Sequence, residues 1–185
     1  GNKLSAVDCS SSDKLVLLDC SENQLGQMDI SALASAKYVY LMNNSITNLI
    51  TGELPLLEEL NVSFNGLTSV NRAKFPGLKA LSVDKNNISS LSVEQNTKLE
   101  KLYCKSNKIQ ALDITMLPGL KELSASGNRL TTIDLSKNEQ LELLALKDNS
   151  LESINLGNNA KLTEINVNEN KLKAIDLSKC TNLVE

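Results

Sequence analysis

The chain has 185 residues, a formal net charge of −3 and no histidine, and its aromatic side chains are three tyrosines and two phenylalanines. Five aromatic residues are few for the core of a globular domain of this length. There is no basic stripe to attract nucleic acid or an anionic membrane, and no apolar run approaches the about 20 residues of a membrane-spanning helix. Without histidine, the usual general base and the common Cys-His and Ser-His-Asp arrangements are excluded, and the four cysteines are too dispersed for a zinc site. We therefore expect no enzymatic activity, no cofactor, no bound metal, no nucleic-acid partner and no membrane insertion.

An asparagine recurs every 21 residues, without insertion, along nearly the whole chain. Apolar residues stand eight, five and three positions before it and two positions after it, which gives the pattern L-x-x-L-x-[LVC]-x-x-N-x-L. Self-similarity at this period is typical of a solenoid, in which each repeat buries its apolar face only against its neighbours. The pattern itself is the leucine-rich repeat signature. The eight asparagines of this ladder are Asn23, Asn44, Asn65, Asn86, Asn107, Asn128, Asn149 and Asn170.

The repeat frame makes residues 1–185 a single domain. Residues 1–14 are interpreted as the tail of one repeat, 15–182 as eight full repeats, and 183–185 as the start of a ninth. Terminal repeats need a polar outer face, and neither end shows a distinct cap. We expect further repeats, a separate domain or end-to-end association with another molecule to cover the ends.

In each repeat, the apolar alternation before the asparagine predicts a short strand. Stacked strands then form a parallel sheet of eight or nine members on the concave side of a curved, right-handed coil. The asparagine must leave the strand in a tight turn, and its amide can bond main-chain groups of its own coil and the adjacent one. Because buried polar groups almost always have partners, this favours a structural role for the ladder over a catalytic one.

The return path on the convex side is expected to change along the chain. Seven positions after the asparagine, two early repeats carry the polar residues Thr51 and Arg72, and ten positions after it they carry Leu54 and Phe75. An unpaired arginine cannot enter an apolar layer, so the inward position is expected to move by three residues, which is the step of a helical turn. This predicts that Leu54 and Phe75 are buried and that Arg72 is exposed. Helical or 3-10 turns are expected near 50–55 and 71–76, and extended backbone around 133–136 and 175–178.

The stretch I-D-L-S-K-N at 133–138, and its shorter counterpart at 175–179, combine with L-x-x-L-x-C-x-x-N. Together they resemble the 21-residue leucine-rich repeats of bacterial cell-surface proteins, which include cysteine-containing internalin-like proteins and relatives in gut Bacteroidetes. The resemblance spans every repeat and implies a secreted or cell-surface solenoid that binds a protein or glycan on its concave sheet. In two respects the chain departs from that family: only Cys20 and Cys104 occupy the position of the cysteine ladder, and no capping domain of the family is recognisable.

The cysteines are expected to be buried free thiols that pack as small apolar groups. Cys20 and Cys104 lie four repeats apart, which at about 4.8 Å per repeat exceeds the about 7 Å limit between bridged α-carbons. Cys9 takes the place of an inward aliphatic residue, and Cys180 lies near the far end. A disulfide between Cys9 and Cys20, across one coil, is the alternative.

The exposed face of the concave sheet is the candidate functional surface. Its outward positions stand six, four and two before each asparagine, and all three tyrosines fall there. One interpretation is the strand propensity of tyrosine, and the other is a binding patch, since tyrosine and methionine are enriched at interfaces. The candidate ligand-binding residues are Leu17, Tyr38, Tyr40, Met42 and Tyr103.

Charge alternates in sign at the position seven before each asparagine, which predicts a ladder of ion pairs along one edge of the concave sheet. Such exposed pairs contribute more to register and solubility than to stability. Two functions remain open from the sequence: a surface recognition module for a protein or glycan, and a structural spacer that holds other domains apart. The alternating residues are Lys37, Glu58, Lys79, Glu100, Lys121 and Glu142.

Overall fold

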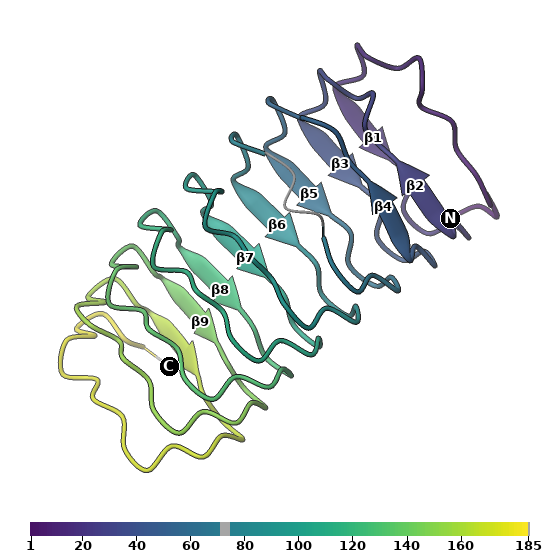
Figure 1. Ribbon diagram of the computed structural model, residues 1–185. Helices are drawn as coiled ribbons and strands as arrows, with labels where there is room; N and C mark the ends of the chain where they lie inside the picture. Colours follow the sequence, from purple (N-terminus) through teal and green to yellow (C-terminus); the bar gives the residue numbers. More distant parts are fainter. Residues whose placement is uncertain (71–74, 185) are drawn as a thin grey trace.

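The computed structural model describes residues 1–70 and 75–184, and this part of the chain forms a parallel β-solenoid without a helix. The coils stack along one axis, and the two termini lie at opposite ends of the stack (Figure 1). Each coil takes 21 residues, because strand pairing joins residues 21 positions apart, as in the pair Leu17 and Tyr38. The predicted leucine-rich repeat fold is therefore confirmed. Since the described residues contain no helix, none of their segments is a candidate for a membrane-spanning helix.

The main sheet has eight parallel strands of three residues each, ordered as in the sequence except that two strands of a second sheet intervene. Main-chain hydrogen bonds continue the ladder beyond the strands, for example from the N–H of Leu41 to the carbonyl of Asn61 at 2.8 Å. The prediction of eight or nine short strands is confirmed. The strands are β1 (Leu17–Asp19), β3 (Tyr38–Tyr40), β5 (Glu59–Asn61), β6 (Ala80–Ser82), β7 (Lys101–Tyr103), β8 (Glu122–Ser124), β9 (Leu143–Ala145) and β10 (Glu164–Asn166).

The core is a stack of aliphatic layers, one from each coil. Side chains of a strand alternate between its two faces, so the middle residue of every three-residue strand points inward while its two neighbours face solvent. In the coil of β5, Leu57, Leu60, Val62 and Leu67 are completely buried. Full burial of such a side chain contributes about 1.5–3 kcal/mol, so each layer supports its neighbours without large aromatic rings. The low aromatic content is thus a consequence of the architecture.

The first full repeats contain a second, two-stranded sheet that the sequence analysis did not predict. It pairs β2 (Gln27–Asp29) with β4 (Asn48–Ile50) in the return path, and the middle residues Met28 and Leu49 are buried. Farther along, Asp134 and Asn155 form an isolated parallel bridge, consistent with the extended backbone expected there.

The prediction of a helical or 3-10 turn at 50–55 is wrong. β4 ends at Ile50, and the next turn is closed by a hydrogen bond from the N–H of Leu57 to the carbonyl of Leu54 at 3.2 Å. Leu54 and Phe75 are buried as expected, whereas Arg72 and most of the 71–76 turn lie outside the described residues.

The error came from treating the seventh and tenth positions as alternatives. In most coils both point inward, because a β-turn from the seventh carbonyl to the tenth N–H lies between them. Ile30 and Leu33 are both fully buried and are joined by such a bond at 3.2 Å. A second turn follows, from the tenth carbonyl to the thirteenth N–H, as from Leu33 to Ala36 at 3.0 Å. The coil that contains Thr51 has only this second turn, from Leu54 to Leu57, so the convex side changes along the chain by the loss of a turn and not by the gain of a helix.

The residue before each ladder asparagine has a left-handed backbone conformation, with φ between 49° and 66°. This conformation costs an L-residue about 1–2 kcal/mol, yet only one of the eight positions holds glycine. Neighbouring coils hold the main chain there, as where the N–H of Lys85 donates to the carbonyl of Lys105 at 2.7 Å. The positions are Glu22, Asn43, Phe64, Lys85, Ser106, Gly127, Asp148 and Glu169.

The last coil is less well covered than the central ones. Ile165, Val167 and Leu172 are half-buried, whereas the equivalent residues Leu144 and Leu146 of the preceding coil are fully buried. At the other end of the stack, Leu4 and Val16 are exposed. That further repeats or another molecule cover these surfaces stays a prediction.

Candidate functional site

The ladder asparagines join each coil to the one before it. The side-chain nitrogen of Asn107 donates to the carbonyls of Val83 in the preceding coil (3.0 Å) and of Cys104 and Lys105 in its own coil (3.2 and 3.3 Å). Its side-chain oxygen accepts the N–H of Ile88 at 3.0 Å. The same four bonds recur at every ladder asparagine from Asn44 to Asn170. We infer that these amides hold the main chain in place where the strand ends, which leaves them no chemical task.

A second row of buried asparagines was missed by the sequence analysis. Asn138 and Asn159, both ten positions after a ladder asparagine, are fully buried. The side-chain nitrogen of Asn138 donates to the carbonyls of Ile114 and Leu117 at 2.9 and 2.8 Å, which links two coils on the convex side. The signal for this row was an amide at a position that carries leucine in other repeats.

Four of the five predicted ligand-binding residues lie together on the concave face. Strand pairing places Leu17 beside Tyr38, and Tyr40 occupies the next outward position of β3. Met42 follows, and its sulfur accepts a hydrogen bond from the side-chain amide of Asn61 at 3.7 Å. Leu17 is 50% exposed and the other three are partly exposed. We call Leu17, Tyr38, Tyr40 and Met42 the aromatic patch.

Tyr103, the fifth predicted residue, lies apart from the aromatic patch. Three strand steps separate β7 from β3, which corresponds to roughly 14 Å. Its hydroxyl donates to a carboxylate oxygen of Glu122, and the other oxygen of Glu122 lies 2.8 Å from the ammonium of Lys101. Partial burial, the bond to Glu122 and the negative charge of that carboxylate raise the pKa of Tyr103 well above its ordinary value. The hydroxyl of Tyr103 is therefore anchored by Glu122, which is itself paired with Lys101.

Carboxylates line the face between the tyrosines, and the sequence analysis did not single them out. Glu59 lies beside Tyr38 in the sheet, and its charge adds to the partial burial that raises the pKa of Tyr40. Asp84 accepts the main-chain N–H of Lys105 at 2.6 Å, and its partial burial raises its own pKa. The signal for both was available, since they occupy outward positions of the repeat frame.

The predicted ion ladder is formed in part. Glu58 lies between Lys37 and Lys79, with nitrogen–oxygen distances of 3.7 and 2.8 Å, and Lys121 contacts Glu100 at 2.7 Å. Hydrogen bonds from Lys79 and Lys121 lower the pKa values of the two glutamates. These carboxylates therefore stay ionised, as expected of an exposed edge of the sheet.

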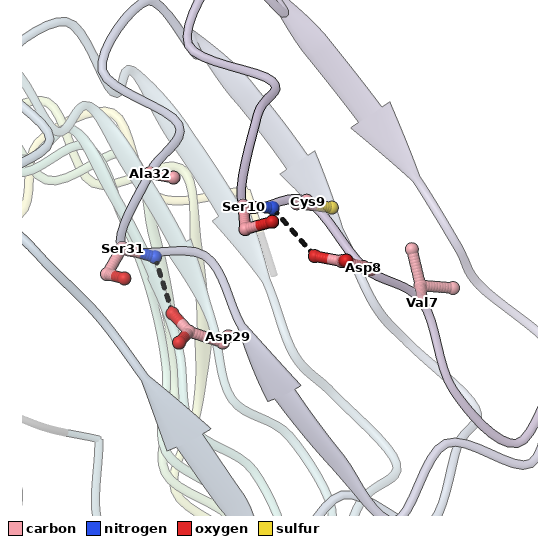
Figure 2. Close-up of a pocket in the computed structure, with 7 residues that line it drawn as sticks. All are labelled: Val7, Asp8, Cys9, Ser10, Asp29, Ser31 and Ala32. Atoms are coloured by element: carbon pink, nitrogen blue, oxygen red, sulfur yellow. Dashed lines mark hydrogen bonds between the residues drawn. The ribbon is translucent and has the colours of Figure 1, made fainter.

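A cavity of about 260 Å³ lies near the N-terminal end, where two adjacent coils turn (Figure 2). Asp8 and Asp29 line it, and each accepts the N–H of the serine two residues later, at 2.9 Å. These hydrogen bonds lower the pKa of both carboxyl groups. Asp113 and Asp134 repeat the arrangement at another cavity, so it is a turn motif of the repeat and not an isolated catalytic pair.

All four cysteines are buried and free, so the expectation of unbridged thiols is confirmed, and Cys9 and Cys20 form no disulfide. Burial raises the pKa of each thiol and makes it unreactive. Among residues 1–70 and 75–184, no three His, Cys, Asp or Glu side chains gather as metal ligands would.

Comparison with solved structures identifies the architecture. The functional domain of InlJ from Listeria monocytogenes is 28% identical, with a TM-score of 0.79 over 98% of this chain. The chain has an internalin-type leucine-rich repeat fold. YopM, a leucine-rich effector protein from Yersinia pestis, is 29% identical over 85% of the chain with a TM-score of 0.73. The Arabidopsis receptor kinase HAESA, solved in complex with the peptide hormone IDA and the co-receptor SERK1, is 26% identical over 88% of the chain with a TM-score of 0.78.

The chain spans less than half of each of these structures: 46% of the InlJ domain, 44% of YopM and 31% of HAESA. No protein-family model matches the sequence, and no curated protein matches it. Leucine-rich repeat proteins of this kind are typically protein-interaction modules.

Proposed function

We propose that this chain is a non-enzymatic recognition module that binds a protein partner on the concave face of its main sheet. The observation that carries the proposal is the aromatic patch, in which strand register brings Leu17, Tyr38, Tyr40 and Met42 side by side. Tyrosine and methionine are enriched at interfaces, because they supply contact area together with a polar or adaptable group. HAESA, whose repeats share this fold, was solved with a peptide hormone, which supports a peptide-like partner here.

The chemistry of the site favours binding over catalysis. Glu58, Glu100 and Glu122 are held ionised by neighbouring lysines, with pKa values below the ordinary range, so none is poised as a general acid or base near neutral pH. The raised pKa of Tyr103 keeps its hydroxyl protonated. A sheet face that combines rings, amides and fixed charges is suited to recognition of a partner's surface.

We further propose a secreted or cell-surface setting, on the basis of the likeness to the InlJ domain. A glycan ligand and a spacer role are the competing possibilities. A spacer requires only the stacked core and the asparagine ladder, and it gives no reason for an exposed patch of Leu17, Tyr38, Tyr40 and Met42.

The test is a selection on immobilised protein, with a display library of random twelve-residue peptides and, in parallel, a glycan array. Wild type is compared with a Tyr38→Ser and Tyr40→Ser double variant. The matched control is Ile50→Ser with Leu56→Ser, which removes two exposed apolar side chains outside the concave sheet. Peptides enriched on wild type are expected to bind the tyrosine variant about tenfold or more weakly, equivalent to about 1.4 kcal/mol, and to bind the control normally.

Three results would contradict the proposal. Peptides that bind the tyrosine variant as well as wild type would show that the aromatic patch is not the site. Glycan binding without peptide binding would change the class of ligand. No enrichment of either kind would favour the spacer.

A further inference from the structure

The charges of the concave face are divided unevenly along the solenoid. Each coil has three outward positions on the concave face. Over the four coils of β1, β3, β5 and β6 these positions carry a total of three carboxylates and no basic residue. The carboxylates are Asp19, Glu59 and Asp84. The next four coils carry three lysines and two glutamates at the same positions. The aromatic patch therefore lies in the acidic half of the face.

Tyr40 and Tyr103 occupy the same row of outward positions in the sheet. The two residues between them in that row are Asn61 and Ser82, and Ala80 lies beside Ser82 in β6. These three side chains are shorter than the two tyrosines, so a partner's main chain or a long side chain can lie over the roughly 14 Å between the two rings. This row is formed by the second outward position of each coil. Glu59 and Asp84 lie on opposite sides of it, at the first outward position of one coil and the third of the next.

The basic groups nearest to Glu59 and Asp84 already have other partners or are exposed, and Lys85, whose charge acts on Asp84, lies over the ring of Phe64. Lys79 contacts Glu58 at 2.8 Å, and Lys101 contacts Glu122 at 2.8 Å. Lys105 is exposed beside Asp84, which holds its main-chain N–H. Glu59 and Asp84 are both partly buried already, so a partner that covered them without supplying positive charge would remove water from two carboxylates. That desolvation is costly unless a cation replaces the water.

We propose that the partner presents an arginine or lysine side chain to this part of the face, where the cation stacks on Tyr40 and pairs with Glu59, and Asp84 adds negative charge nearby. The inference rests on the proposed function and adds the chemistry of the ligand to it. The faces of the tyrosine rings attract a cation, and a guanidinium can bond a carboxylate while it stacks on a ring. The same half of the sheet would reject an acidic segment, because Asp19, Glu59 and Asp84 would repel it.

The experiment uses the peptides enriched on wild type in the selection above. Their composition is read first, and the dissociation constant of one tyrosine-dependent peptide is then measured on a Glu59→Gln and Asp84→Asn double variant. An amide at position 84 can still accept the N–H of Lys105, so the fold is expected to survive, and a urea midpoint checks this. The control is Glu139→Gln with Glu152→Gln, which removes the same charge from exposed positions outside the concave face.

We expect arginine or lysine in most tyrosine-dependent peptides. Affinity should fall about 5- to 30-fold in the Glu59 and Asp84 double variant and less than about twofold in the control. Raising the salt from about 50 mM to about 300 mM should weaken wild-type binding more than binding to that double variant. Tyrosine-dependent peptides that are neutral or acidic, or that bind the double variant as well as wild type, would overturn this inference and leave the proposed function standing. Selection without any tyrosine-dependent peptide would overturn both.

Discussion

Neighbouring ladder asparagines share a main-chain carbonyl, and this sharing predicts that their deletions are coupled. The carbonyl of Val83 accepts hydrogen bonds from the side-chain nitrogens of both Asn86 and Asn107, each at 3.0 Å. The side-chain oxygens of the same two asparagines accept the N–H groups of Leu67 and Ile88, at 2.9 and 3.0 Å. Asn86 and Asn107 are 8% and 9% exposed, so water does not readily replace these bonds.

The magnitude follows from which groups lose all their partners. In Asn107→Ala, the N–H of Ile88 loses its acceptor, whereas the Val83 carbonyl keeps Asn86 as a donor. A buried orphaned donor costs about 1–3 kcal/mol, and with the other lost bonds we expect about 2–4 kcal/mol for each single variant. The Asn86→Ala and Asn107→Ala double variant also orphans the carbonyl. It should lose about 1–3 kcal/mol more than the sum of the singles.

The assay is urea unfolding followed by circular dichroism, on wild type, both single variants and the double variant. At about 0.05–0.15 kcal/mol per residue, a chain of this length has a free energy of unfolding of about 9–28 kcal/mol, whereas the double variant should lose about 5–11 kcal/mol. All samples therefore contain the same concentration of sucrose, which stabilises the folded state, so that the double variant is folded at the start of its titration. The control cycle pairs Asn86→Ala with Asn149→Ala, three coils away, where no carbonyl is shared. Its two effects should add within about 0.5 kcal/mol. Equal coupling in both cycles, or none in either, would refute the reasoning.

Three further predictions follow from the turns and the charged groups. Gly127→Ala should cost about 1–2 kcal/mol of stability, for its left-handed backbone alone. Gly157→Ala should cost about 3 kcal/mol or more, because a Cβ there would also lie 2.5 Å from a main-chain carbon of the preceding coil. Similar urea midpoints for the two variants would contradict this. Since Glu122 helps to raise the folded-state pKa of Tyr103, stability should fall as pH rises above 10. Glu122→Gln should move the ionisation of Tyr103 to lower pH, measured by absorbance with Tyr103→Phe as the reference. Identical titration curves of Tyr103 in wild type and Glu122→Gln would contradict this. The folded-state pKa of Glu58 is lowered, so Glu58→Gln should reduce the urea midpoint above pH 5 and lose this effect as pH falls below 4. A difference in urea midpoint between wild type and Glu58→Gln that persists at pH 3 would count against the ion ladder.

The solenoid could be predicted from the sequence because every repeat carries apolar residues and an asparagine at the same spacing. Leu60 and its equivalents stand at one spacing, and a single register satisfies all of them. The left-handed turns could not be found that way, because the residue before each asparagine varies from Phe64 to Gly127. Main-chain bonds between coils impose that conformation, and the identity of the side chain does not.

The return path was harder to predict, because two physical solutions fit one pattern. A buried Leu54 is compatible with a helical turn or with an extended segment followed by a β-turn, and periodicity does not distinguish them over so few residues. Asn138 was harder still, since an amide at an inward position reads as solvent-facing until the carbonyls of Ile114 and Leu117 are seen beside it. The repeat spacing could locate Tyr103 on the concave face, but its bond to Glu122 depends on strand pairing.

The two interpretations of the concave face, strand propensity and a binding patch, differ in which outward residues they explain. Strand propensity accounts for Tyr38 and Tyr40, which both lie in β3. It does not account for Met42, which lies beyond the end of that strand. Nor does it account for Leu17, an apolar residue that is 50% exposed and so contributes little to the core. Nor does propensity explain why the outward positions of the coils of β1, β3, β5 and β6 carry carboxylates and no basic residue. Stability requires only the inward positions and the ladder, so the composition of the outward ones is free to serve a partner, and a partner that is cationic and partly apolar matches all of these residues together.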